Sequence, residues 1–295
     1  MSTMNRAISE QPIGTIRVGS PSYPEMLKNI PKPPEEFFVR GNLDAVHPAV
    51  AIVGTRKATA VGLKTAEEFA RKLGEAGFAI ISGLALGIDS AAHRGALKAG
   101  AKTVAVLGCG IDKVYPAHNE ILAEEIIKCG GAVISEYPAG HSVRKYNFLD
   151  RNRIISGLAL ATIVVESPAR SGSLRTAGCA AEQGRTVFVI PGPISHPNYE
   201  GSHALIRDGA TLVTRVEEII SDLGLGNMIA RRARNTGENN KQNALIEILR
   251  RTGAPLNLDE IIELTGLGMP EIASLLTALA IEGKVAENGG RYEII

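Results

Sequence analysis

The stretch from Arg151 to Thr176 combines basic side chains with a small-residue turn and reads RNRIISGLALATIVVESPARSGSLRT. Its middle part, Ala161 to Val165, is apolar and β-branched, which is typical of a central strand in a parallel sheet. The turn that follows is expected at the carboxyl edge of the sheet, where open α/β folds bind ligands. The N–H groups of Ser171, Gly172 and Ser173, at a helix start, suit a phosphate or another anion. The stretch therefore predicts a phosphate-backbone site that is served by three arginines, Arg151, Arg153 and Arg170.

Two further glycine-containing turns follow predicted strands. The strand Ala49–Val53 is followed by Gly54, Thr55 and Arg56, and the strand Phe78–Ile81 is followed by Ser82 and Gly83, which begin the sequence SGLALGID. Taken alone, the first turn is a weak signal, since a tight turn with a surface arginine explains it equally well. Because all these turns fall after strands, we expect them at one edge of the sheet, where they form a backbone cradle for phosphate with a guanidinium beside it.

Two acidic residues near these turns each allow two interpretations. Asp89 is either a helix N-cap or an acid/base group, and capping is the simpler interpretation. Glu166 ends the central strand and either orients a guanidinium or a base edge, or forms a structural ion pair.

Several enzyme classes lack their motifs in this sequence. The stretch from Gly83 to Gly87 is GxxxG rather than the GxGxxG of dinucleotide-binding folds, and no phosphate-binding loop of the nucleoside triphosphatases is complete. The SGS turn is not the GxSxG of a serine hydrolase, and the histidines have no metal-ligand spacing. We therefore expect no cofactor and no metal.

The composition is that of a soluble α/β protein. The chain has 295 residues, 44% hydrophobic residues, 32 glycines, a net charge of +1 and three isolated cysteines, which favours a reducing compartment. No signal peptide precedes the first strand, and no apolar run approaches the roughly 20 residues of a membrane helix. We expect a cytoplasmic protein with no membrane contact, whose basic surface is a local patch.

Strands alternate with helical patterns from Ala49 to Val213, which predicts the fold class: α/β, an extended Rossmann-like, mostly parallel sheet with a small C-terminal winged-helix domain. The predicted domains are an N-terminal lead-in arm (1–46), the core (47–223), a basic polar linker (224–241) and the winged-helix domain (242–295).

The C-terminal domain is predicted to contain helices at Asn243–Arg251, Leu258–Leu264 and Pro270–Ile281, and a two-stranded wing at Lys284–Ile295. From Lys241 to the end the chain has five basic and eight acidic residues, a net charge of 5 − 8 = −3. The third helix has no Lys or Arg from Pro270 to Ile281. Because phosphate neutralisation drives most DNA affinity, this domain is a poor candidate for binding duplex DNA by itself.

An ordered set of short motifs resembles the DNA-processing protein A family (DprA or Smf). The motifs are VGTR (53–56), SGLALGID (82–89), VYP (114–116), EYP (136–138), RNRIISG (151–157) and SGSL followed by TA (171–177). The resemblance implies a DNA-binding protein of natural transformation that protects incoming single-stranded DNA, dimerises, helps load RecA recombinase and has no catalytic turnover. The DNA-binding residues that we assign from the motifs and the turns are Gly54, Thr55, Arg56, Ser82, Gly83, Arg151, Asn152, Arg153, Arg170, Ser171, Gly172, Ser173 and Arg175.

The sequence departs from the family pattern at a few positions. Arg175 replaces a hydrophobic residue and either extends the basic pocket or points to solvent, and His203 replaces an asparagine. Leu149 and Asp150 stand where the family has a proline. Binding through phosphates should be independent of base sequence and sensitive to salt, with Tyr115, Tyr146, Phe148 and Tyr199 as the candidates for base stacking.

One alternative is a phosphoribohydrolase-like enzyme of the lysine-decarboxylase-like group, which cleaves nucleoside monophosphates and carries a PGGxGTxxE motif. The corresponding turn here is SGSLRT with Glu182 further on, so the catalytic glutamate is out of place. A second alternative is a scaffold that recruits a partner through the linker and the wing.

Overall fold

The computed structural model describes residues 12–44 and 46–295, with backbone only for residues 228–240. The chain divides between Leu225 and Gly226 into two compact units, each with its own core.

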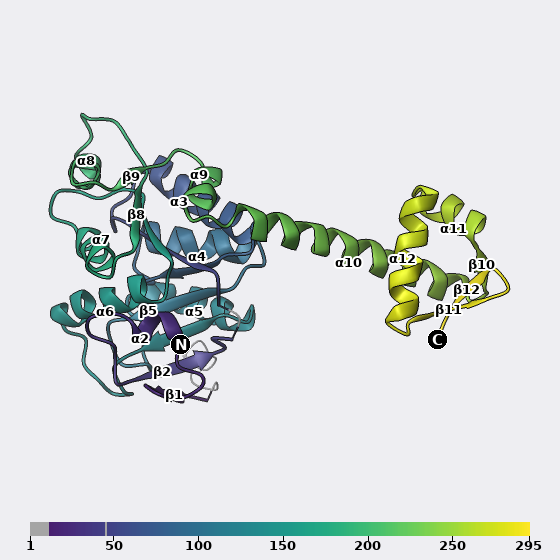
Figure 1. The fold of residues 1–295 in the computed structure, drawn as a ribbon. Coiled ribbons are helices and arrows are strands. Elements are labelled where there is room, and N and C mark those ends of the chain that lie inside the picture. Colours follow the sequence, from purple (N-terminus) through teal and green to yellow (C-terminus); the bar gives the residue numbers. More distant parts are fainter. Residues whose placement is uncertain (1–11, 45) are drawn as a thin grey trace. The chain divides into compact units, whose positions relative to one another are not determined.

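The first unit is built on a nine-stranded sheet with the order β1-β2-β6-β5-β4-β3-β7-β8-β9 (Figure 1). The strands from β6 to β9 in this order are parallel, and β1 and β2 are antiparallel to their neighbours. The strands are β1 (Gly14–Arg17), β2 (Glu36–Gly41), β3 (Ala49–Val53), β4 (Ala79–Ser82), β5 (Thr103–Leu107), β6 (Ala132–Ser135), β7 (Ala161–Val164), β8 (Thr186–Val189) and β9 (Thr211–Leu212).

The strand order reverses direction next to β3. The chain runs outward through β4, β5 and β6 on one side of β3, and then crosses to β7 on the other side, from which β8 and β9 follow. In open α/β sheets, ligands bind outside the carboxyl ends of the strands at such a reversal. The turns after β3 and β7 therefore meet at the position where this fold class places its ligand.

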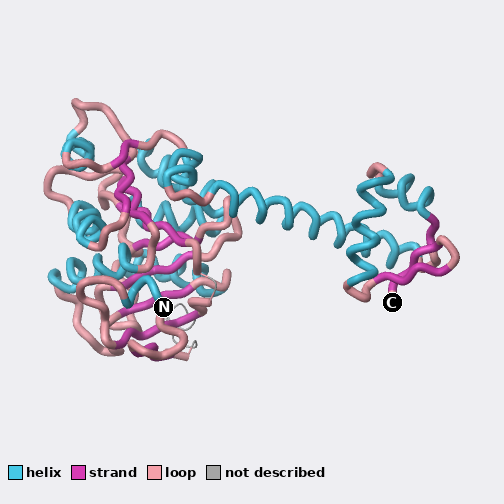
Figure 2. The backbone as a smooth tube through the Cα atoms, in the orientation of Figure 1, coloured by secondary structure: helices cyan, strands magenta, loops and turns pink. Residues whose placement is uncertain are grey.

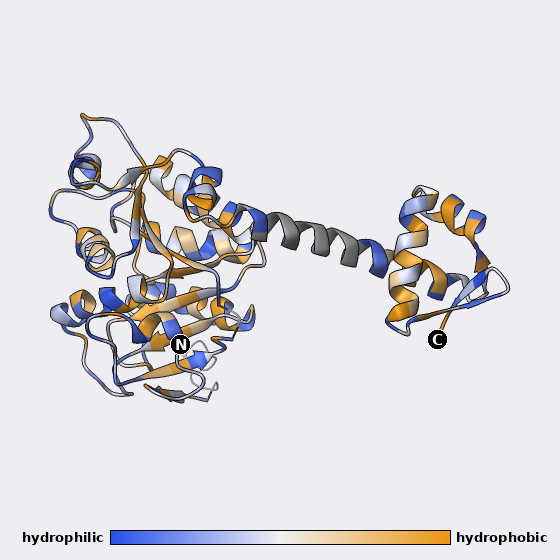
Figure 3. Cartoon of the chain, in the orientation of Figure 1, coloured by the Kyte–Doolittle hydropathy of each residue, from blue (hydrophilic) through white to orange (hydrophobic). Residues whose placement is uncertain are grey.

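Helices cover both faces of the sheet (Figure 2). They are α2 (Glu25–Lys28), α3 (Ala60–Glu75), α4 (Ile88–Lys98), α5 (Glu120–Lys128), α6 (Lys145–Gly157), α7 (Gly172–Glu182), α8 (Glu200–Arg207) and α9 (Val216–Asp222), with short 3₁₀ turns at Ala117–Asn119 and Pro197–Tyr199. All five residues of β3 and of β5 are buried, because both faces of these strands are covered. Figure 3 shows the central strands of the sheet mostly in the colour of hydrophobic residues.

The lead-in segment is part of the sheet rather than an irregular arm. Residues Phe38 to Gly41 pair antiparallel with β6, and β1 pairs with β2 at the sheet edge. The guanidinium of Arg185 fastens this segment to the core, because it donates hydrogen bonds to the carbonyl oxygens of Ser156, Ala159 and Met26.

The second unit contains α10 (Gly226–Thr252), β10 (Leu256–Asn257), α11 (Leu258–Thr265), α12 (Met269–Ile281), β11 (Val285–Asn288) and β12 (Arg291–Ile294). Residues 224–241 were predicted as a linker, but the backbone is helical from Gly226. The predicted two-stranded wing is the hairpin of β11 and β12, and β10 adds a third strand to its sheet in the order β10-β12-β11. With these differences, the predicted fold class of both units is confirmed.

Among the residues that the structure describes, no single helix is long and apolar enough to cross a membrane. The bent pair α11 and α12 has the length and apolar composition of a broken membrane span. In this structure the pair packs into the core of the second unit, to which it contributes Ile261, Ile272, Leu275, Leu276 and Leu279.

Candidate nucleic-acid interface

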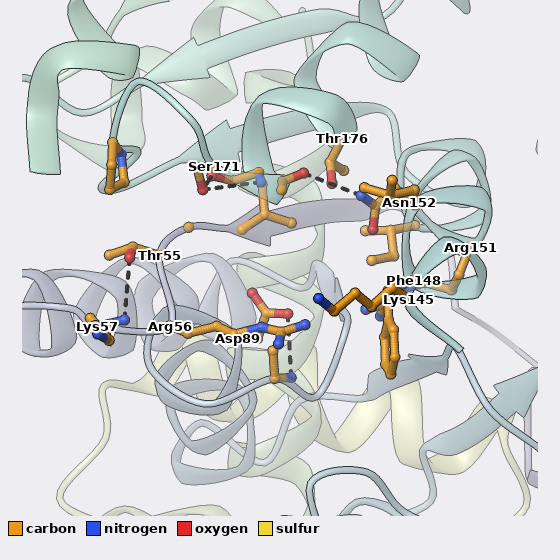
Figure 4. A pocket seen from close by; sticks show the side chains of 18 of the residues that line it. Thr55, Arg56, Lys57, Asp89, Lys145, Phe148, Arg151, Asn152, Ser171 and Thr176 are labelled. Atoms are coloured by element: carbon orange, nitrogen blue, oxygen red, sulfur yellow. Dashed lines mark hydrogen bonds between the residues drawn. The ribbon is translucent and has the colours of Figure 1, made fainter. Parts of the chain in front are cut away.

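A groove of about 800 Å³ lies at the carboxyl edge of the sheet, where the turns after β3 and β7 face α6. Figure 4 shows side chains from these three segments turned toward one space. Its walls include residues 53–57, the α6 residues Lys145, Phe148, Leu149, Arg151, Asn152 and Ile155, and, from the segment after β7, Pro168, Arg170, Ser171, Gly172, Ser173 and Thr176. The first segment is far from the other two in the sequence, so the groove exists only because β3 and β7 are neighbours.

The turn after β3 forms the first wall. A Cβ at Gly54 would lie 2.5 Å from Ile88 Cγ1 and 2.9 Å from the carbonyl oxygen of Glu166, so only glycine fits this close approach. The N–H of Thr55 donates to the same carbonyl oxygen at 2.7 Å. The turn leaves Arg56 exposed, with its guanidinium carbon 5.6 Å from the centre of the Phe148 ring.

Glu166 holds both ends of this turn, Thr55 through its carbonyl oxygen and Thr59 through its carboxylate. Its side chain is 0% exposed and its carboxylate accepts hydrogen bonds from Thr59 N (3.0 Å), Thr59 Oγ1 (2.5 Å), Asn198 Nδ2 (2.9 Å) and Tyr199 Oη (3.1 Å). Burial acts to raise the pKa of Glu166, but these hydrogen bonds outweigh it and lower the pKa below its ordinary value. Among the described residues, the carboxylate binds neither a guanidinium nor an ammonium group, so its interpretation as an ion pair is wrong.

The N-terminus of α7 forms the second wall. Ser171 is its N-cap, and the Ser171 Oγ accepts from the N–H of Ser173 at 3.3 Å. The hydroxyl of Ser173 is 2.6 Å from that of Ser171 and 2.9 Å from that of Ser167. A Cβ at Gly172 would meet nothing within 4 Å, so there is space beside the turn. The free N–H groups of a helix start carry a partial positive charge, which suits an anion here.

Arg151 forms part of the groove wall but is only 4% exposed. Its Nη1 donates to the carbonyl oxygen of Val106, and its guanidinium occupies the space that a Cβ at Gly83 would fill. Burial lowers the pKa of Arg151 to about 10, while the negative charge of Asp89 acts in the opposite direction. Arg151 is thus a buried positive charge, which acts on the groove mainly through its electrostatic potential rather than by direct contact with a ligand.

Asp89 lies in the first turn of α4 and is 6% exposed. Its Oδ2 accepts from the N–H groups of Gly83 (3.2 Å) and Ala85 (3.4 Å), so it holds the turn before the helix, and Gly87 occupies the N-cap position instead. Burial raises the pKa of Asp89, and the charge of Arg151 lowers it.

The structure brings most of the predicted site residues together. Nine of them line the groove: Gly54, Thr55, Arg56, Arg151, Asn152, Arg170, Ser171, Gly172 and Ser173. Ser82 and Gly83 lie outside the groove lining, and the Ser82 hydroxyl donates to the carbonyl oxygen of Ile52 at 2.7 Å. Arg153 and Arg175 line a different cavity.

Sequence reasoning missed two exposed lysines of the groove, Lys57 and Lys145. A signal for Lys145 was present, because Lys145, Phe148, Asn152 and Ile155 repeat at helical spacing and share one face of α6. Among the ion pairs that the described residues form, none involves the exposed groove cations Arg56, Lys57, Lys145 or Arg170. These four charges are therefore available to a ligand.

Known relatives match the chain along most of its length. Protein Smf of Escherichia coli K12 is 39% identical over 284 residues, which are 94% of this chain and 76% of that protein. DNA processing protein DprA of Streptococcus pneumoniae is 44% identical over 201 residues, which are 68% of this chain and 71% of that protein.

Two solved structures agree with these sequence matches. The X-ray structure of DprA from S. pneumoniae has a TM-score of 0.67 at 41% identity, over 73% of this chain and 75% of that one. DprA from Helicobacter pylori has a TM-score of 0.65 at 28% identity, over 73% of this chain and 97% of that one.

Family models cover both units of the structure. The model described as DprA winged helix domain matches residues 230–291, and the model described as DNA recombination-mediator protein A matches residues 14–224. The chain belongs to the DNA recombination-mediator protein A family.

Proposed function

We propose that this protein binds single-stranded DNA in the groove between the turns after β3 and β7. The observation that carries the proposal is the meeting of two anion-binding turns with four exposed cations, Arg56, Lys57, Lys145 and Arg170, that are in no ion pair among the described residues. Successive phosphates of one strand would lie on the N–H groups of the two turns, and the cations would neutralise the backbone.

The aromatic residues of the groove favour a single strand over a duplex. Phe148 and Tyr115 both line the groove with their ring centres 5.5 Å apart, and accessible rings such as the exposed Tyr115 stack on unpaired bases but not on paired ones. A volume of about 800 Å³ is within the range of small-ligand pockets and holds a few nucleotides. The solved H. pylori relative is described by its single-stranded DNA binding mode, which supports the same ligand here.

Fluorescence anisotropy with labelled oligo-dT and a matched duplex tests this proposal. The wild-type protein should prefer oligo-dT, and Arg56→Ala/Lys145→Ala should weaken binding by about 100-fold, since each charged contact contributes roughly 1.5 kcal/mol. Lys128→Ala, an exposed lysine outside the groove, is the matched control and should bind as the wild type does. Equal binding of both DNAs, or an unaffected double variant, would reject the proposal.

Family membership supports a wider role that the same groove would serve. We propose that the protein protects incoming single-stranded DNA during natural transformation, acts as a homodimer and helps load RecA recombinase onto the strand. The description of the family as a recombination mediator favours this role. Strand exchange by RecA on protein-coated DNA, with wild type and the groove variant, tests the loading, and sedimentation tests the dimer.

The groove would act by binding rather than by turnover. Glu182, the glutamate that a phosphoribohydrolase-like enzyme would need at the SGS turn, lines a separate cavity. Incubation with nucleoside monophosphates should release no free base, and release would restore the enzyme alternative.

A further inference from the structure

A second cavity of about 170 Å³ lies beside the groove, on the other side of α6 and α7. Leu149 lines both cavities, so they adjoin there. The lead-in segment closes one side of the second cavity with Ile30, Pro31 and Lys32. The two helices send Arg153 and Arg175 into it, which are the two predicted DNA-binding arginines that the groove does not contain.

Arg153, which lines this cavity, has an unused donor. Its Nη2 is paired with Glu136 at 2.5 Å, while its Nη1 is buried and has no hydrogen-bond partner among the described residues. A buried guanidinium donor without a partner is costly unless a ligand or water satisfies it. Arg153 therefore brings to the cavity a positive charge that has one unsatisfied donor.

Two further cations surround the same space. Lys32 and Arg175 are exposed, and among the described residues neither is part of an ion pair. Asp150 and Glu182 also line the cavity, but both are exposed, whereas Arg153 is partly buried. Three basic groups around a small space, one with an unpaired donor, suit one phosphate group better than a base.

We propose that the second cavity binds a backbone phosphate of the same single strand after it leaves the groove across Leu149. This inference rests on the proposed function and extends it, because it specifies the path of the strand beyond the groove. The strand passes from the α7 N-terminus over Leu149 to the face of α7 that carries Arg175. Arg153 supplies a fixed positive charge, and Lys32 and Arg175 neutralise the phosphate from the surface.

Binding of a short and a long oligonucleotide separates the two cavities. Anisotropy would be measured with oligo-dT of about 5 nucleotides, which fills the groove, and of about 20 nucleotides, which extends beyond it. Lys32→Ala/Arg175→Ala should weaken binding of the long strand about tenfold and leave the short strand within twofold, with the slope of log K against log salt reduced by about 0.7 per lost phosphate contact. Lys128→Ala is the control for a lost surface charge and should change neither affinity.

Each other result overturns the inference. If the double variant binds both lengths as the wild type does, or loses both equally, the second cavity does not hold the strand. If inorganic phosphate binds the DNA-free protein by calorimetry, and the double variant loses that signal without losing long-strand affinity, the cavity is a site for a free anion. If the wild type binds neither length, the proposed function fails as well, so the two failures are distinguishable.

Discussion

At the scale of single residues, Glu166 shows how one buried carboxylate fixes a ligand-binding turn. It binds four donors from Thr59, Asn198 and Tyr199, and its own carbonyl oxygen accepts from Thr55. A Cβ at Gly62 would collide with this carboxylate, so the helix start of α3 is built closely around it. The position of Arg56 at the groove therefore depends on Glu166, which does not itself line the groove.

Glu166→Ala should lower the free energy of unfolding by about 3 kcal/mol, because it leaves several buried donors without an acceptor. It should also weaken oligo-dT binding, because the carboxylate no longer holds Thr59 at the end of the turn that carries Thr55 and Arg56. Urea unfolding and anisotropy measure the two effects. Wild-type stability in Glu166→Ala would contradict the role of the carboxylate.

The stability that Glu166 supplies should depend on pH. Because its pKa is lower in the folded chain than its ordinary value of 4.5, the carboxylate stabilises the fold above about pH 4.5, and this contribution is lost as the pH falls through the folded pKa. The difference in unfolding free energy between wild type and Glu166→Gln should therefore shrink at acidic pH. A difference that stays constant from pH 7 down to acid unfolding would show that the charge does not matter.

At the scale of elements, the helix start at Ser171 is both a cap and an anion site. Ser171→Ala removes the cap of α7 and should cost about 1 kcal/mol, whereas Ser171→Gly should cost only a few tenths. If the backbone N–H groups hold the phosphate, Ser171→Gly should also keep most of the affinity for oligo-dT. A large loss of affinity in Ser171→Gly with normal stability would assign the contact to the Ser171 hydroxyl instead.

The sequence was sufficient to predict the parallel part of the sheet, because apolar strands such as Ala49–Val53 and Thr103–Leu107 alternate with amphipathic helices. It did not predict that Glu36–Gly41 joins this sheet, since the partner of that strand, β6, is almost a hundred residues away. The helical backbone from Gly226 was also missed, because a polar segment without apolar periodicity is typical of a linker.

The candidate site could be predicted only in part, because the sequence indicates the individual turns but not which strands are neighbours. Each turn could be placed at the carboxyl edge of the sheet, but the adjacency of β3 and β7 is a property of strand order, which the sequence does not state. Helical geometry explains why Arg151 and Arg153 separate: residues two apart on a helix point in nearly opposite directions. One arginine therefore lines the groove, and the other lines the second cavity.

At the scale of the whole molecule, the two units differ in how their basic residues are used. In the second unit Lys241, Lys284 and Arg291 are each within 4 Å of an acidic group, Glu271, Glu282 and Glu260. In the first unit the exposed groove cations have no such partners among the described residues. Charges that are already paired contribute little to the binding of a polyanion, so these three residues of the second unit should add little to the affinity.

A salt titration of oligo-dT binding tests this division of charge. Arg56→Ala/Lys145→Ala/Arg170→Ala should reduce the slope of log K against log salt by about 2, at 0.7 per phosphate contact. Lys241→Ala/Lys284→Ala/Arg291→Ala removes the same number of charges from the second unit and should leave the slope unchanged. A larger effect of the second variant would place the strand on the second unit.

The most direct test of the groove is amide hydrogen exchange of the full chain with and without oligo-dT. The turns at 54–57 and 171–174 supply the N–H groups that would bind phosphates, so their exchange should slow when the strand is bound. Residues 226–295 should exchange at the same rate in both states. Protection confined to residues 226–295, or unchanged exchange at both turns despite saturating oligo-dT, would contradict binding in the groove.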